Sequence, residues 1–87
     1  MKLEKIFGDA PLIRVLDFLL ENQTFDFTKK EISKNAKVNF KTLNKILPKL
    51  QNNKIIVPTR RIGKAILYKL NDKSEIVKII LEFKKKV

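Results

Sequence analysis

The side chains that could do chemistry in this chain are its lysines and arginines, which are unevenly spaced. Residues 28–71 hold twelve of the twenty bases and one acid, Glu31, so this stretch carries a charge of +11. The whole chain has the same net charge, because the flanking segments sum to −2 (three bases, five acids) and +2 (five bases, three acids). A basic field confined to one unit is typical of a surface that binds a polyanion, most often nucleic acid. A merely solvated lysine-rich surface would not explain why acids avoid this stretch.

The sequence offers little material for catalysis. It has no histidine and no cysteine, which removes the commonest general base, the thiolate nucleophile and the usual zinc ligands. Its nine carboxylates are scattered, and its two glycines stand alone, so it has no glycine-rich phosphate loop. We therefore expect no enzymatic activity, no metal site and no cofactor. An all-carboxylate metal site and small-molecule sensing stay open.

Length and composition predict one small folded domain over residues 1–87. Hydrophobic residues make up 44% of the chain, enough for a modest core. No apolar run approaches the roughly 20 residues that span a bilayer. Residues 1–10 mix acids with bases and lack the apolar segment of a signal peptide. We expect a cytoplasmic protein with no membrane partner.

Residues 11–21 predict an amphipathic helix with a wide apolar face. Its polar residues Arg14, Asp17 and Glu21 are three and four positions apart, which predicts one narrow solvated stripe. The run Thr24–Phe27 then has phenylalanines at alternate positions and predicts a brief strand.

Two short helices across a tight turn are predicted next. Thr28 and Glu31 have the spacing of a capping box, which predicts a helix over residues 29–36. After a turn, Asn39 can cap a second helix whose apolar residues recur at three- and four-residue spacing. The predicted buried stripe of that helix is Phe40, Leu43, Leu47 and Leu50.

The end of this second helix has two unusual features. Pro48 removes the hydrogen bond to the Asn44 carbonyl, so the helix either kinks there or ends near Leu47. No glycine follows it, so Asn52 or Asn53 is expected to supply the left-handed residue that ends the helix.

The period of the sequence then changes. Runs 55–60 and 65–70 predict a β-hairpin, with Gly63 able to take the positive φ that its turn needs. Pro58 cannot donate to a ladder, which places its strand at an edge of the sheet. A final helix is predicted over residues 73–86.

The predicted order of elements resembles that of winged helix-turn-helix regulators. From about residue 11 to residue 70 the chain is similar to compact archaeal and bacterial regulators of the MarR and ArsR kind. Residues 38–43 resemble the family's turn and recognition helix, and residues 60–65, with 68–70 behind them, resemble its wing. The resemblance implies an α+β, mostly helical fold: helix, short strand, helix-turn-helix, β-hairpin wing and C-terminal helix.

The expected recognition helix and wing supply the candidate DNA-binding residues. In the helix, asparagine can pair with adenine and lysine can donate to guanine, so these side chains are predicted to face the major groove. Wing arginines are predicted to reach phosphates or the adjacent minor groove, and the start of the preceding helix to meet the backbone. The candidates are Lys29, Lys30, Asn39, Lys41, Thr42, Asn44, Lys45, Lys49, Arg60, Arg61 and Lys64. Phe40 could wedge or stack on DNA, but its place in the buried stripe favours a core role.

Apolar surface on the first and last helices predicts a homodimer. One side of each helix can complete the core, and the remainder should pack across a two-fold axis. The predicted interface residues are Leu12, Leu16, Leu20, Ile76, Ile80 and Phe83. Such a dimer would set two recognition helices about one DNA turn or a multiple apart. The alternative is a monomer whose last helix folds wholly onto its own domain.

These features predict a transcriptional regulator that binds double-stranded DNA sequence-specifically as a homodimer. Two alternatives stay open: a winged helix used as a protein-interaction scaffold, and an RNA-binding module. A scaffold does not need an acid-free recognition helix and wing. The lack of exposed aromatic residues outside the predicted core stripes disfavours single-stranded RNA, whose recognition relies on stacking platforms.

Overall fold

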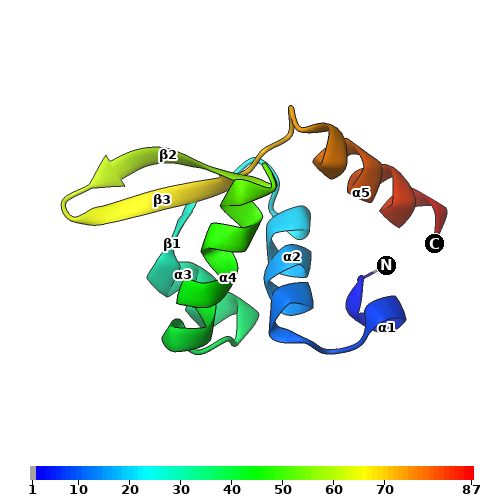
Figure 1. Cartoon of the computed structure of the whole chain (residues 1–87), viewed down its shortest axis with the longest axis horizontal. Coiled ribbons are helices and arrows are strands. Elements are labelled where there is room, and N and C mark those ends of the chain that lie inside the picture. The colour runs from blue at the N-terminus through cyan, green and yellow to red at the C-terminus, as the bar shows by residue number, and fades with distance from the viewer. Residues whose placement is uncertain (1) are drawn as a thin grey trace.

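The computed structural model describes residues 2–87 as five helices and three strands (Figure 1). The helices are α1 (Glu4–Phe7), α2 (Pro11–Glu21), α3 (Lys29–Ala36), α4 (Phe40–Asn52) and α5 (Glu75–Lys86). The strands are β1 (Phe27–Thr28), β2 (Ile56–Ile62) and β3 (Ala65–Leu70). The predicted order of elements is confirmed, with α1 as an addition that the sequence did not predict.

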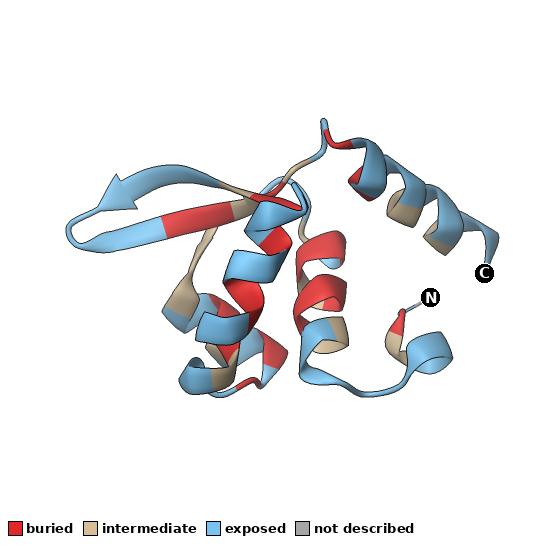
Figure 2. Ribbon diagram, viewed as in Figure 1, coloured by how far each residue is buried: buried red, intermediate tan, exposed pale blue. Residues whose placement is uncertain are grey.

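The molecule has two ends, separated by α2. In Figure 1 the β2–β3 hairpin projects to one side, beyond α3 and α4, and we call these elements the hairpin end. On the other side of α2 lie α1, α5 and both chain termini, which we call the terminal end. Buried residues line the facing sides of α2 and α4 and the base of the hairpin (Figure 2). The core is therefore centred between the two ends.

Helices α3 and α4 both begin at local side-chain caps. Thr28 Oγ1 accepts from the Glu31 N–H (3.2 Å), and Glu31 Oε1 accepts from the Thr28 N–H (2.9 Å), so the predicted capping box is confirmed. Lys37 closes α3 in the left-handed conformation, with φ 57°. Asn39 Oδ1 then accepts from the Thr42 N–H (2.8 Å) and starts α4, as predicted.

The end of α4 corrects two expectations. The helix runs through Pro48 to Asn52, so the alternative that it ends near Leu47 is wrong. The left-handed residue is Lys54, with φ 60°, whereas Asn53 has φ −94°. This conformation carries the chain back so that the next N–H, of Ile55, donates to the Leu50 carbonyl (2.8 Å). That bond satisfies a carbonyl of the last helical turn and offsets the strain at a non-glycine residue.

The buried stripe of α4 also differs from the prediction at its first residue. Leu43, Leu47 and Leu50 are buried as expected, and Ile46 joins them. Phe40 is 47% exposed, so the expected core role is wrong. It occupies the first position of α4, and the core begins only one turn further along the helix.

The sheet is antiparallel with strand order β1-β3-β2, which places Pro58 on an edge strand as predicted. Gly63 takes the expected positive φ (61°) in a two-residue turn. Strand β2 extends two residues beyond the predicted Arg60, and Thr59 forms a bulge, because Pro58 pairs with Tyr68 and Arg60 with Leu67. The bulge shifts the residues that follow it by one position relative to β3.

The predicted strand over residues 24–27 is displaced. Strand β1 contains only Phe27 and Thr28. The Phe25 N–H donates to the Asn22 carbonyl (3.2 Å), so the chain is still turning where the strand was expected to begin. The Phe27 ring packs on Phe18 of α2, with ring centroids 4.6 Å apart.

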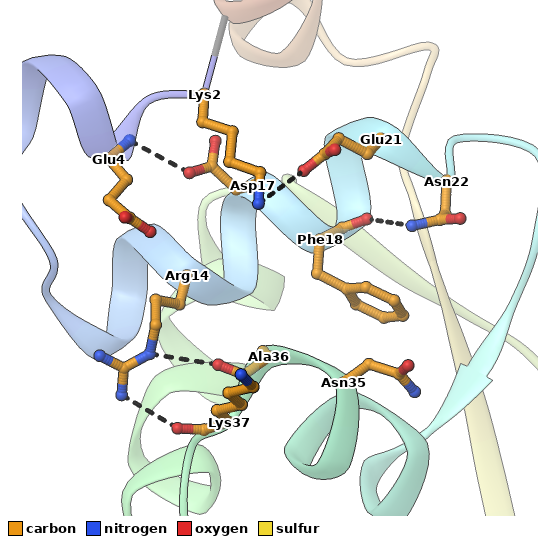
Figure 3. A pocket seen from close by; sticks show the side chains of 10 residues that line it. All are labelled: Lys2, Glu4, Arg14, Asp17, Phe18, Glu21, Asn22, Asn35, Ala36 and Lys37. Atoms are coloured by element: carbon orange, nitrogen blue, oxygen red, sulfur yellow. Dashed lines mark hydrogen bonds and ion pairs between the residues drawn. The ribbon is translucent and has the colours of Figure 1, made fainter.

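The polar stripe of α2 is not simply solvated, because two of its members organise neighbouring segments. Asp17 is buried, and its carboxylate accepts from the N–H groups of Leu3 (2.7 Å) and Glu4 (3.1 Å), which caps α1. Figure 3 shows the pocket beside these contacts, which the Lys2–Glu21 ion pair also borders. A buried acid that caps a neighbouring helix is a tertiary contact, which helical periodicity did not predict.

Arg14, the first polar residue of α2, holds the end of α3. Its Nε donates to the Ala36 carbonyl (3.1 Å) and its Nη2 to the Lys37 carbonyl (3.0 Å), as Figure 3 shows. A cation at a helix C-terminus is favoured by the carbonyl dipoles there. Arg14 thus fixes the turn that leads into α4.

Helix α5 begins at Glu75, two residues later than predicted, with Ser74 as its N-cap residue. Val77 is fully buried, and Ile80 and Leu81 pack against the core. Ile79 remains 66% exposed. None of the helices within residues 2–87 combines the length and the apolarity that crossing a membrane requires.

Candidate nucleic-acid interface

The structure leaves the predicted DNA-binding side chains accessible. Nine of the eleven residues are exposed, and Lys29 and Thr42 are half-buried. Lys41, Lys45 and Lys49 follow one another at four-residue spacing and therefore lie along one face of α4. Neither α4 nor the β2–β3 hairpin contains an acidic residue. The hairpin end therefore presents a row of cations suited to a phosphate backbone.

The remaining polar candidates near α4 differ in how free they are. Asn44 is exposed and forms no side-chain hydrogen bond within the described residues. The Asn39 carbonyl oxygen is occupied by the cap of α4, so only its amide NH₂ is available to a partner. Glu31, the one acid of the basic stretch, is likewise occupied by the capping box. The caps of α3 and α4 thus occupy the side-chain oxygens of Glu31 and Asn39, which would otherwise be free to pair with the nearby lysines.

Arg60 is paired within the chain, which the sequence did not predict. Asp26, just before β1, accepts hydrogen bonds from Arg60 Nε (2.9 Å) and Nη2 (3.3 Å) and from Thr59 Oγ1 (2.6 Å). The Arg60 guanidinium, and after it the Thr59 hydroxyl, lower the pKa of the Asp26 carboxyl below its ordinary value. The same contact raises the pKa of Arg60. Arg60 is therefore held on the hairpin rather than directed freely outward.

The other hairpin cations have no such partner. Arg61 and Lys64 form no ion pair within residues 2–87. Both arginines follow the bulge at Thr59, and Arg61, opposite Ile66, lies one position nearer the turn than Arg60, which Asp26 holds. Among the three predicted hairpin residues, Arg61 and Lys64 thus have the greater freedom to meet an anion.

The first turns of α3 and α4 meet strand β3 around a groove of about 460 Å³. Lys29 and Lys30 from α3 and Lys64 from the hairpin line it, together with the exposed ring of Phe40. The structure therefore brings together basic residues of α3 and of the hairpin turn with an aromatic ring from α4.

The predicted dimer residues fall into two groups. Leu16 and Leu20 are buried in the hydrophobic core of the protomer. The other four are exposed or half-buried at the terminal end: Leu12, Ile76, Ile80 and Phe83. Ile80 and Phe83 line an apolar groove of about 400 Å³ between α1, α2 and α5, together with Phe7 and Ile79, whereas Leu12 and Ile76 do not line it.

No protein-family model matches the chain, and no curated protein matches its sequence. Several solved structures do match. The transcriptional regulator HlyU from Vibrio vulnificus CMCP6 superposes with a TM-score of 0.65 at 18% identity, covering 97% of this chain and 92% of that chain. Rv0081 from M. tuberculosis superposes with a TM-score of 0.66 at 22% identity, covering 94% and 77%. A mutant of ZitR from Lactococcus lactis in apo form gives 0.62 at 23% identity, covering 95% and 61%.

These matches extend over nearly the whole chain and include the hairpin. The fold is a winged helix-turn-helix. In this fold α3, the turn and α4 form the helix-turn-helix, α4 is the recognition helix, and the β2–β3 hairpin is the wing. The fold class expected from the sequence is confirmed. At identities of 18–23% the likeness concerns the fold, and the ligand of this chain has to be argued from its own residues.

Proposed function

We propose that this protein is a transcriptional regulator that binds double-stranded DNA as a homodimer. The observation that carries the proposal is the placement of exposed, acid-free cations on the recognition helix and the wing of a winged-helix fold. Phosphate contacts supply most of the affinity of such a surface, and base contacts supply the specificity. The charge distribution and the fold thus support the same ligand.

In the proposed complex α4 enters the major groove. Lys41, Asn44 and Lys45 lie in its first two turns, ahead of Pro48, and all three are exposed. Their donors suit the acceptor atoms of guanine and adenine in that groove. Arg61 and Lys64 on the wing bind phosphates or enter the adjacent minor groove, and the first turn of α3 lies against the backbone.

The proposed dimer is supported by the terminal end of the protomer. Phe83, Ile76 and Ile79 are exposed there, and Phe83 and Ile79 line the apolar groove between α1, α2 and α5. An exposed apolar surface of this kind on a small chain is a candidate interface between copies, since the same patch can meet itself across a two-fold axis. The two recognition helices would then face the same side of a duplex.

Selection from random duplex DNA, followed by titration at several salt concentrations, tests the proposal. If each subunit neutralises about three to five phosphates, the log–log salt slope of a dimer is about −5 to −9. A flat salt response, or no binding at low salt, contradicts DNA binding. Equal affinity for double-stranded RNA of the same sequence favours the RNA-binding alternative. Absence of binding to either nucleic acid favours the protein-interaction scaffold.

A further inference from the structure

An exposed aromatic ring in the middle of a basic surface needs an explanation. Phe40 is 47% exposed at the first position of the recognition helix, and Ile66 on β3 is 36% exposed. Both line the groove of about 460 Å³ between α3, α4 and the wing, with the buried Tyr68 also in its wall. Exposed apolar area costs free energy in water, and a ligand that covers it recovers that free energy.

The rim of the same groove defines the class of ligand. Lys29 and Lys30 line it from α3 and Lys64 lines it from the turn of the wing, and none of the residues that line it is acidic. A ligand here must therefore be anionic overall and must present an apolar group to Phe40 and Ile66. Duplex DNA meets both requirements, because it carries phosphates and displays the C5-methyl group of thymine in the major groove.

We propose that Phe40 is a specificity-determining residue that contacts the C5-methyl group of a thymine in each half-site, with Ile66 beside it. The inference rests on the proposed function and deepens it by naming a base that the site must contain. The N-terminal residues of a recognition helix are those that reach base edges, and Phe40 is the first residue of α4. Stacking between bases, the other use of an apolar side chain, belongs to proteins that kink DNA from the minor groove.

Deoxyuridine provides the test, because it differs from thymidine only by the absence of this methyl group. Each thymine of a duplex selected by the wild-type protein is replaced singly by deoxyuridine, and the dissociation constant is measured. We expect one thymine per half-site at which the replacement weakens binding by about three- to fivefold, the value for one buried methyl group. Contact with a deoxyribose alone would leave the dissociation constant unchanged.

Variants connect the effect to the side chain. In Phe40→Ala the deoxyuridine effect disappears at that thymine and persists at any other sensitive one. Phe40→Leu, which keeps an apolar side chain, retains part of the effect. Phe25→Ala is the matched control, since Phe25 is also exposed and does not line this groove. Circular dichroism shows that each variant is folded.

Each outcome decides the inference. Intact binding of every deoxyuridine duplex overturns the methyl contact while leaving the proposed function standing. Survival of every deoxyuridine effect in Phe40→Ala assigns each methyl group to another residue and also overturns it. Failure of the wild-type protein to bind any duplex at low salt removes the proposed function and this inference together.

Discussion

The two ends of this molecule are held together in different ways. At the hairpin end the helices begin at side-chain caps only three residues away, as at Thr28 and Asn39, and the turn of the wing depends on Gly63 alone. At the terminal end α1 is capped by Asp17 from another helix, and Phe7 contacts Phe83 near the opposite end of the chain.

The two ends also differ in the side chains that their surfaces present. At the hairpin end short-range hydrogen bonds start both helices, strand pairing and the Asp26–Arg60 contact join distant residues, and the surface carries lysine and asparagine. The terminal end is fixed by tertiary contacts and leaves apolar side chains such as Ile79 exposed. The first surface suits a charged ligand, and the second suits another apolar surface.

The largest expected effect is loss of the dimer, which one substitution on each surface can assign to the terminal end or to the hairpin end. Ile79→Asp should weaken a dimer by about 3–6 kcal/mol, because a buried isoleucine contributes about 1.5–3 kcal/mol and a two-fold interface buries two copies. Sedimentation equilibrium at micromolar concentration measures it: the wild-type chain should sediment at twice 10.2 kDa and the variant at 10.2 kDa.

Ile62→Asp is the matched control for this prediction, since Ile62 is equally apolar and exposed but lies next to the turn of the wing. It should leave the dimer intact and weaken DNA binding. A monomeric wild-type protein, or loss of the dimer in Ile62→Asp, would show that the assignment of the two surfaces is wrong.

The next effect concerns the stability of the terminal end. Asp17→Ala leaves the Leu3 and Glu4 N–H groups without their acceptor, and should lower the free energy of unfolding by about 2–4 kcal/mol. Urea denaturation monitored by circular dichroism measures the change. Glu21→Ala is the control on the same helix: its ion pair with Lys2 is long (3.9 Å) and exposed, so the change should stay within about 0.5 kcal/mol. Equal losses for both variants would contradict the capping role.

A smaller effect tests the hairpin end. Lys45→Ala should weaken a selected duplex more than random DNA, by roughly 1–3 kcal/mol if Lys45 contacts a base. Lys85→Ala removes the same charge from the end of α5 and should change neither affinity beyond a small long-range term. Titration of both duplexes at one salt concentration measures the affinity of each variant. Equal losses of affinity for Lys45→Ala and Lys85→Ala would contradict the assignment of α4 as the helix that contacts bases.

The smallest expected effect concerns the Asp26–Arg60 pair. Asp26→Asn frees Arg60 for phosphate, so the salt slope should become steeper by about one for each subunit. Arg60→Ala should leave the slope of the wild type nearly unchanged, because Arg60 is already paired. A shallower slope in Arg60→Ala would mean that Arg60 leaves Asp26 to bind DNA.

The pair also has a pH dependence of known sign. Because Arg60 lowers the pKa of Asp26 in the folded chain, the pair stabilises the fold above the ordinary aspartate pKa of about 4. That stabilisation is lost as the pH falls through the lower, folded-state pKa. Thermal unfolding of the wild type and Asp26→Asn should therefore differ at neutral pH and converge in acid. A difference that grows toward low pH would contradict the assignment.

The hairpin end could be predicted from the sequence because its signals are local. The capping box at Thr28, the cap at Asn39 and the glycine of the turn each act within about four residues. Alternating hydrophobicity and Pro58 together placed the edge strand. In these places the residues that form the sequence pattern are also the residues whose contacts determine the local structure.

Other features depend on contacts between residues far apart in the sequence, which local patterns do not predict. Helical periodicity identified the buried face of α4 but not where along the axis the core begins, so Phe40 was placed inside. Asp26 meets Arg60 only because the strand order brings them together, and the role of Asp17 depends on a terminal segment that folds back. The dimer residues Leu16 and Leu20 were chosen by periodicity, which does not distinguish two apolar sides of one helix.

The contact between Phe7 and Phe83, with ring centroids 5.9 Å apart, has a consequence for the order of folding. It closes a loop of nearly the whole chain, and the chain entropy lost on closing a loop rises with its length. Because contacts between distant residues form slowly, we expect α1 and α5 to reach their final positions last. We expect the same two segments to open first by local unfolding. In the proposed dimer a second subunit would cover this late-forming contact, so that assembly completes the folding of each chain.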